Sequence, residues 1–202
     1  NKVLRGVSFD IRRGRTLCVV GESGCGKSVT ANSILRLLPE LSRIESGSIT
    51  YYKEDGSEVR LDQLEKNGKE MRALRGQDIA IIFQDPMTAL NPVFTVGYQI
   101  EEMLREHKKG LTKAQYKEEA IEDLADMGIP APEIRYGEYP HQFSGGMRQR
   151  SMIAMGMSCE PKILLADEPT TALDVTISAQ IFDLMNELKE KHGTAIMMIT
   201  HN

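Results

Sequence analysis

The sequence predicts an α/β fold in which a helical segment interrupts an alternating strand-helix core. Three observations favour this fold. An apolar strand-like run precedes a glycine-rich loop and a helix-like segment, strands and helices alternate towards both ends of the chain, and residues 91–156 contain no convincing strand. The 202 residues suffice for one substantial core. We therefore expect one domain over 1–202, with a core from 1–90 and 157–202 and a helical subdomain from 91–156.

Hydrophobic periodicity gives each expected element its boundaries. Strand-like runs cover residues 3–11, 16–20, 48–52, 78–83, 162–166 and 194–200. Helical periodicity covers residues 28–38, 61–74, 96–106, 113–127, 145–157 and 177–191. Thr95 and Thr112 precede the third and fourth helices and are expected to cap them. Because the chain opens inside one strand-like run and closes directly after another, we expect it to be cut from a longer protein.

Composition and charge narrow the class of protein. With 41% hydrophobic and 27% charged residues the chain is typical of a globular protein, and no apolar run approaches the ~18 residues of a membrane span. The net charge of −4 gives no electrostatic footprint for nucleic acid. The three cysteines lie far apart without metal-ligand spacing, which favours a reducing compartment such as the cytoplasm.

A phosphate-binding loop is the most informative motif. The pattern G-x-x-x-x-G-K-[ST] directly follows the apolar run 16–20 and comprises Gly21, Glu22, Ser23, Gly24, Cys25, Gly26, Lys27 and Ser28. Glycine-rich loops are common, but a chance match of the four fixed positions is on the order of one in a hundred for such a chain. The loop therefore predicts a P-loop NTPase core, with Lys27 reaching the β and γ phosphates and Ser28 binding Mg²⁺.

An acidic pair follows a second apolar strand. Asp167 and Glu168 end the run that begins at residue 162. In P-loop proteins an aspartate at this place completes the Mg²⁺ shell, which leaves Glu168 free to polarise a water for attack on the γ phosphate. An acidic pair after a strand is more often a turn or a helix cap, but a phosphate loop upstream reverses those odds. We therefore expect Asp167 to bind the metal and Glu168 to be catalytic.

The remaining motifs resemble one family, the ATP-binding subunits of ABC transporters. Residues 143–150 (FSGGMRQR) are similar to that family's signature sequence, which lies about twenty residues before the acidic pair. Gln84 stands in a segment like the family's glutamine loop, Asp174 in one like its D-loop, and His201 resembles its switch histidine. Two positions depart from the signature, since methionine replaces glutamine and phenylalanine replaces leucine. No aromatic residue upstream of position 3 is present to stack on adenine.

The resemblance implies a RecA-like parallel sheet with N-terminal antiparallel strands plus an inserted helical subdomain. It further implies a head-to-tail pair of subunits with ATP and Mg²⁺ between them, in which one phosphate loop faces the partner's Ser144, Gly145, Gly146 and Met147. Gln84 would join the metal site or sense the attacking water, and His201 would hold the γ phosphate. Asp174 would organise the opposing subunit.

Two segments are similar to the importer branch for dipeptides and oligopeptides, which also includes nickel importers. They are residues 83–92 (FQDPMTALNP) and 139–150 (YPHQFSGGMRQR). The likeness implies an ATPase that powers peptide import, with transmembrane permease subunits, a second ATP-binding subunit and a separate substrate-binding protein as partners. It implies a peripheral place on the cytoplasmic face of the membrane and no nucleic acid partner.

Other functions remain as alternatives. One is an importer ATPase for nickel or another small solute, and a second is a soluble ABC ATPase acting on nucleic acid or ribosomes. Only 59 residues separate Gln84 from Ser144, whereas coiled-coil DNA clamps place hundreds there. A P-loop kinase is a third alternative, and it would not need the signature residues.

Overall fold

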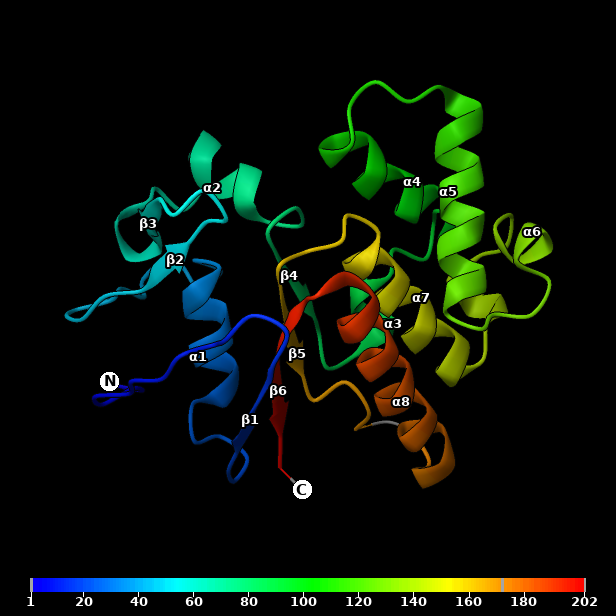
Figure 1. Ribbon diagram of the computed structural model, residues 1–202. Helices are drawn as coiled ribbons and strands as arrows, with labels where there is room; N and C mark the ends of the chain where they lie inside the picture. The colour runs from blue at the N-terminus through cyan, green and yellow to red at the C-terminus, as the bar shows by residue number, and fades with distance from the viewer. Residues whose placement is uncertain (1, 172, 202) are drawn as a thin grey trace.

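The computed structural model describes residues 2–171 and 173–201 and is built around a parallel sheet (Figure 1). Its strand order is β1-β6-β5-β4, with β1 at Thr16–Val20, β6 at Ala195–Thr200, β5 at Ile163–Asp167 and β4 at Ile79–Ile82. The register pairs Thr16 with Ile196 and Ile163 with both Ala195 and Ile79. Because the strands are parallel, their carboxyl ends meet at one edge of the sheet, where ligands of such sheets bind.

Alternating side chains of the strands build a hydrophobic cluster on each face of the sheet. Leu165, Met197 and Ile199 pack with α1 (Lys27–Ile34), with α2 (Lys69–Leu74) and with the antiparallel pair β2 (Thr50–Tyr52) and β3 (Glu58–Arg60). Their sequence neighbours Leu164 and Met198 point to the opposite face, towards α7 (Gly145–Met157) and α8 (Val175–His192). Successive strand side chains alternate in this way, and strands covered on both faces become apolar throughout.

Helices fill the segment between β4 and β5. These are α3 (Pro86–Ala89), α4 (Val96–His107), α5 (Lys113–Asp126), α6 (Pro132–Arg135) and α7, and they form the right-hand side of Figure 1. The two predicted caps are confirmed, since Thr95 Oγ1 accepts a hydrogen bond from the Tyr98 amide and Thr112 forms a capping box with Gln115. Ile100 of α4 and Leu124 of α5 are fully buried in the same hydrophobic cluster.

The predicted strand at 3–11 is wrong. Residues 2–11 contain no strand, and Val3, Val7 and Phe9 are exposed. Gly6 adopts a φ of 68°, which turns the chain out of the extended conformation. Apolar spacing suggested a strand, but the antiparallel pair that forms is β2 with β3, and β3 was not predicted.

Two predicted helices are shorter than expected. The segment 61–74 consists of a 3₁₀ turn at Leu61–Gln63 and the helix α2, because Leu64 and Gly68 between them are extended. The first helix stops at Ile34 and not at residue 38, since Arg36 takes a left-handed φ of 56° and a proline follows at 39. Both errors arise where local backbone geometry overrides an apolar pattern. The short helices α3 and α6 were not predicted either.

Replacing Asp123 of α5 with asparagine is expected to stabilise the protein above neutral pH. Burial raises the pKa of Asp123 to about 7, and one of its carboxylate oxygens is buried without a hydrogen-bond partner. Lys108 opposes this shift, whereas the nearby carboxylates of Glu119, Asp126 and Glu122 add to it. The folded protein thus binds this proton more tightly than the unfolded chain, so stability falls as pH rises from about 4 to 7.

Asp123→Asn removes that loss. The free energy of unfolding at pH 8 should rise by about 2 kcal/mol, and the gain should vanish near pH 4. Chemical denaturation at both pH values measures it. Glu118→Gln serves as the matched control because Glu118 lies on the same helix and its side chain is exposed. A pH-independent effect of Asp123→Asn would contradict the prediction.

Candidate active site

The phosphate loop joins the carboxyl end of β1 to the first turn of α1. Gly24 and Gly26 hold left-handed φ values of 79° and 102°, which side-chain-bearing residues rarely adopt. A Cβ on Gly26 would also lie 2.8 Å from Leu4 Cδ2. The loop conformation therefore requires glycine at this position, directly before the lysine that begins α1.

Lys27 is buried within this loop. Its Nζ donates hydrogen bonds to the carbonyl oxygens of Gly21 at 2.7 Å and Glu22 at 2.8 Å. The side chain is 6% exposed, and Nζ lies 3.9 Å from Glu168 Oε1. A cation is thus fixed at the amino end of a helix, where backbone N–H groups also favour an anion.

Ser28 and Asp167 meet at the start of α1 and the end of β5. Ser28 Oγ donates to Asp167 Oδ1 at 3.0 Å, although 139 residues separate them in the chain. Burial raises the pKa of Asp167, and the hydrogen bond from Ser28 partly offsets this effect. A hydroxyl and a carboxylate side by side supply the oxygen ligands that Mg²⁺ prefers, so this pair fits the predicted metal site.

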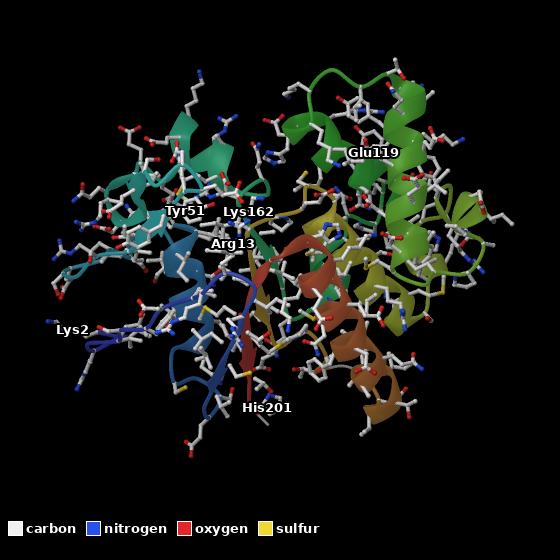
Figure 2. All side chains as sticks on the ribbon, viewed as in Figure 1. Lys2, Arg13, Tyr51, Glu119, Lys162 and His201 are labelled. Atoms are coloured by element: carbon white, nitrogen blue, oxygen red, sulfur yellow. The ribbon has the colours of Figure 1, made fainter. Side chains whose placement is uncertain are left out.

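Two of the predicted catalytic residues, Gln84 and His201, converge on the carboxylate of the third, Glu168. Gln84 Nε2 donates to Glu168 Oε2 at 3.0 Å, and His201 Nδ1 lies 3.2 Å from the same oxygen. These residues follow β4, β5 and β6, so the parallel sheet brings them to its carboxyl edge. Figure 2 shows His201 at the lower end of the sheet, the end at which the phosphate loop leaves β1 in Figure 1.

One member of this group, Thr171, was not predicted from the sequence. Thr171 Oγ1 donates to Glu168 Oε2 at 3.0 Å. A hydroxyl three residues after an acid in a turn is a signal that was available in the sequence, because Ser and Thr side chains commonly bond to nearby groups of a turn. The nearby residues 172–174 were interpreted only as the D-loop, and residue 172 lies outside the described residues.

The signature residues lie at the start of α7, away from the phosphate loop. Ser144 caps α7 by accepting a hydrogen bond from the Met147 amide at 3.2 Å, and a Cβ on Gly146 would lie 3.2 Å from Ile177 of α8. Asp174 similarly caps α8 through the Ile177 amide at 2.9 Å. Within residues 2–171 and 173–201 no hydrogen bond or ion pair joins 144–147 to the loop 21–28. In Figure 1, α7 and α8 lie across the sheet from α1.

One family model matches most of the chain. The family model described as ABC transporter matches residues 4–171. The chain belongs to the ABC transporter family. The match covers the phosphate loop, the glutamine segment, the signature helix and the acidic pair of this family member, and it identifies the family to which the sequence motifs pointed.

Two curated relatives name a transport role. The dipeptide transport ATP-binding protein DppD of Bacillus subtilis (strain 168) is 52% identical over 202 residues, which is 100% of this chain and 58% of the relative. The oligopeptide transport ATP-binding protein OppD of the same organism is 49% identical over 100% of this chain and 54% of its own length. The chain therefore spans somewhat more than half the length of these relatives, and the predicted likeness to peptide transport subunits is confirmed.

A solved structure supports the fold. The dimeric post-hydrolysis state of the ATP-binding cassette MJ0796 bound to ADP and Pi superposes with a TM-score of 0.83 at 28% identity, over 99% of this chain and 80% of that one. The predicted fold class, a parallel P-loop sheet with an antiparallel pair and helices, is confirmed by this likeness. Among the described residues no helix is long and apolar enough to cross a bilayer.

Proposed function

We propose that this chain is the ATP-binding and ATP-hydrolysing part of an ABC importer that moves dipeptides or oligopeptides. The observation that carries the proposal is the position of Glu168. Its carboxylate accepts a hydrogen bond from Gln84, lies 3.2 Å from a ring nitrogen of His201 and 3.9 Å from Lys27 Nζ. Glu168 also follows directly on Asp167, the candidate metal ligand. A carboxylate placed between a phosphate-loop lysine and a metal site suits attack of water on a terminal phosphate.

The loop residues would bind the triphosphate. Backbone N–H groups of residues 21–28 and the ammonium group of Lys27 supply the positive field for the phosphates. Ser28 and Asp167 would hold Mg²⁺, with Gln84 as a further oxygen ligand at the edge of the site. The metal, when bound, neutralises charge that develops on the phosphate oxygens.

The catalytic residues would divide the work of hydrolysis. Glu168 accepts a proton from the attacking water, which makes the water a stronger nucleophile. Gln84 and His201 hold the carboxylate in place by their contacts to Oε2, and His201 also stands at the mouth of the site as a γ phosphate contact. The positive charge of Lys27 attracts both the carboxylate of Glu168 and the phosphates bound by the loop.

A second ATP-binding subunit would complete the site. The hydroxyl of Ser144 accepts the Met147 amide, which leaves its hydrogen free to donate to a phosphate held by the partner. Gly145, Gly146 and Met147 add N–H groups at the head of α7. Asp174, at the head of α8, would organise the partner's site. ATP that contacts both subunits favours the closed pair through its higher affinity for that state.

Coupling to transport requires further partners. The cycle of closing and opening would drive transmembrane permease subunits, with the chain attached peripherally at the cytoplasmic face of the membrane. A separate substrate-binding protein would deliver the cargo. The peptide cargo is supported by the transport roles of the dipeptide and oligopeptide relatives.

Uptake of labelled cargo tests the proposal. In source cells that carry Lys27→Ala in the full-length protein, uptake of labelled dipeptides and oligopeptides is expected to be lost while nickel uptake is unchanged. Lys109→Ala is the matched control, because the Lys109 side chain is 72% exposed in the helical segment between β4 and β5. Loss of nickel uptake alone would replace the peptide cargo with nickel. Unchanged uptake of both would contradict import, and stimulation of the ATPase by nucleic acid or ribosomes would replace it.

A further inference from the structure

Thr171 closes a tight turn around Glu168. The Thr171 amide donates to the Glu168 carbonyl oxygen at 3.3 Å, and the Thr171 hydroxyl donates to Glu168 Oε2 at 3.0 Å. One residue therefore binds both the backbone and the side chain of the glutamate. Among the described residues, the other two side chains in contact with this carboxylate oxygen come from different segments, since Gln84 follows β4 and His201 follows β6.

The backbone of Glu168 needs such support. Its φ of 48° lies in the left-handed region, which costs a residue with a side chain about 1 kcal/mol. The Glu168 amide donates to the Ile199 carbonyl oxygen of β6 at 3.0 Å and so fixes one end of the residue. The bonds from Thr171 fix the other end. The backbone of Glu168 thus has two anchors, of which Thr171 is the one that also binds the carboxylate.

The two carboxylate oxygens of Glu168 have different surroundings. The Gln84 amide and the Thr171 hydroxyl each donate a hydrogen bond to Oε2 at 3.0 Å, and Nδ1 of His201 lies 3.2 Å from the same oxygen. Within the described chain, the contact recorded for Oε1 is Lys27 Nζ at 3.9 Å. A carboxylate oxygen has about two lone-pair sites, so Oε2 is fully occupied and Oε1 keeps capacity for a further hydrogen.

We propose that Thr171 is a positioning residue that holds Glu168 with Oε1 directed at the attacking water. This inference rests on the proposed function, in which Glu168 accepts the proton of that water. The hydroxyl of Thr171 binds Oε2 and so restricts rotation of the carboxylate about the Cγ–Cδ bond of Glu168. Oε1 is then the proton acceptor, on the side of the carboxylate that faces Lys27.

Steady-state ATPase kinetics of the full-length protein in its assembled complex test the inference. Thr171→Val keeps the branched shape and removes the hydroxyl, so kcat should fall about 10-fold to 100-fold as the carboxylate loses its orientation. KM for ATP and the affinity for a fluorescent ATP analogue should stay close to the parent values, because within the described part of the chain the hydrogen bonds of Thr171 go to Glu168 and not to the phosphate loop. Thr171→Ser restores a hydroxyl and should restore kcat.

Two controls separate this role from a structural one. Thr170→Val makes the same change one residue earlier, at a hydroxyl for which no hydrogen bond is found within the described residues, and kcat should be unchanged. Thermal denaturation of all variants reports folding. Thr171→Val with parental kcat, or Thr171→Ser as slow as Thr171→Val, would overturn the inference. A parent that lacks ATPase activity would instead overturn the proposed function, as would a Glu168→Gln variant with full activity.

Discussion

Glu168→Gln is expected to reduce ATP turnover by about 10²–10³ while ATP affinity stays near that of the parent. The amide has almost the same shape as the carboxylate but cannot accept the proton of the attacking water. Lys27, Ser28 and Asp167, which are expected to bind the nucleotide and Mg²⁺, are unchanged. Binding and turnover should therefore separate, and parallel measurements of phosphate release and of fluorescent nucleotide binding reveal the separation.

The same variant should accumulate as a closed pair. ATP contributes binding energy to both subunits only in the closed state, and hydrolysis is the step that removes this bridge. Light scattering of the full-length Glu168→Gln protein with Mg-ATP should therefore report a dimer that the parent does not maintain. Glu187→Gln on α8 is the control, since this glutamate is exposed and is not one of the predicted site residues. A variant that stays monomeric with ATP bound would count against the two-subunit site.

The core of the fold could be predicted because its sequence signals are local and strong. The runs that became β5 and β6 are apolar up to their last residue, as expected of strands covered on both faces, and β1 is a mostly apolar run whose side chains alternate between exposed and half-buried. The segment at 3–11 has similar apolar residues but no partner strand, and no single sequence reveals which strands pair. The break at residues 64–68 likewise depends on extended backbone between two short helical pieces.

The sequence motifs predicted most of the residues of the site but not the contacts between them. The motifs identified Gln84, Glu168 and His201, but only the parallel sheet explains why three segments so far apart in sequence reach one oxygen. Thr171 went unassigned because its hydroxyl fits an ordinary turn equally well. The signature residues were identified in the sequence, but their proposed role needs a second subunit. A single chain shows only that Ser144 caps α7.

Lys27→Ala is expected to weaken ATP binding about 10-fold to 100-fold, since hydrogen bonds to charged groups contribute about 1.5–3 kcal/mol. Two carbonyl oxygens of the loop hold the ammonium group at 2.7 and 2.8 Å, so the cation is already in place before phosphate binds. Little side-chain entropy is then lost on binding, and more of the charge interaction appears as affinity. Calorimetric titration with ATP and Mg²⁺ measures the change.

Lys27→Met distinguishes loss of charge from loss of packing. Lys27 is buried, and its ammonium group ties the loop together, so the alanine variant loses both the cation and the filling of a crowded loop. Methionine restores most of the volume without charge. Equal weakening in both variants assigns the effect to the cation, and full recovery in Lys27→Met would contradict the electrostatic role. Lys109→Ala, which removes an exposed cation from the helical segment between β4 and β5, should bind ATP like the parent. A loss of affinity confined to Lys27 would therefore locate the triphosphate on this loop.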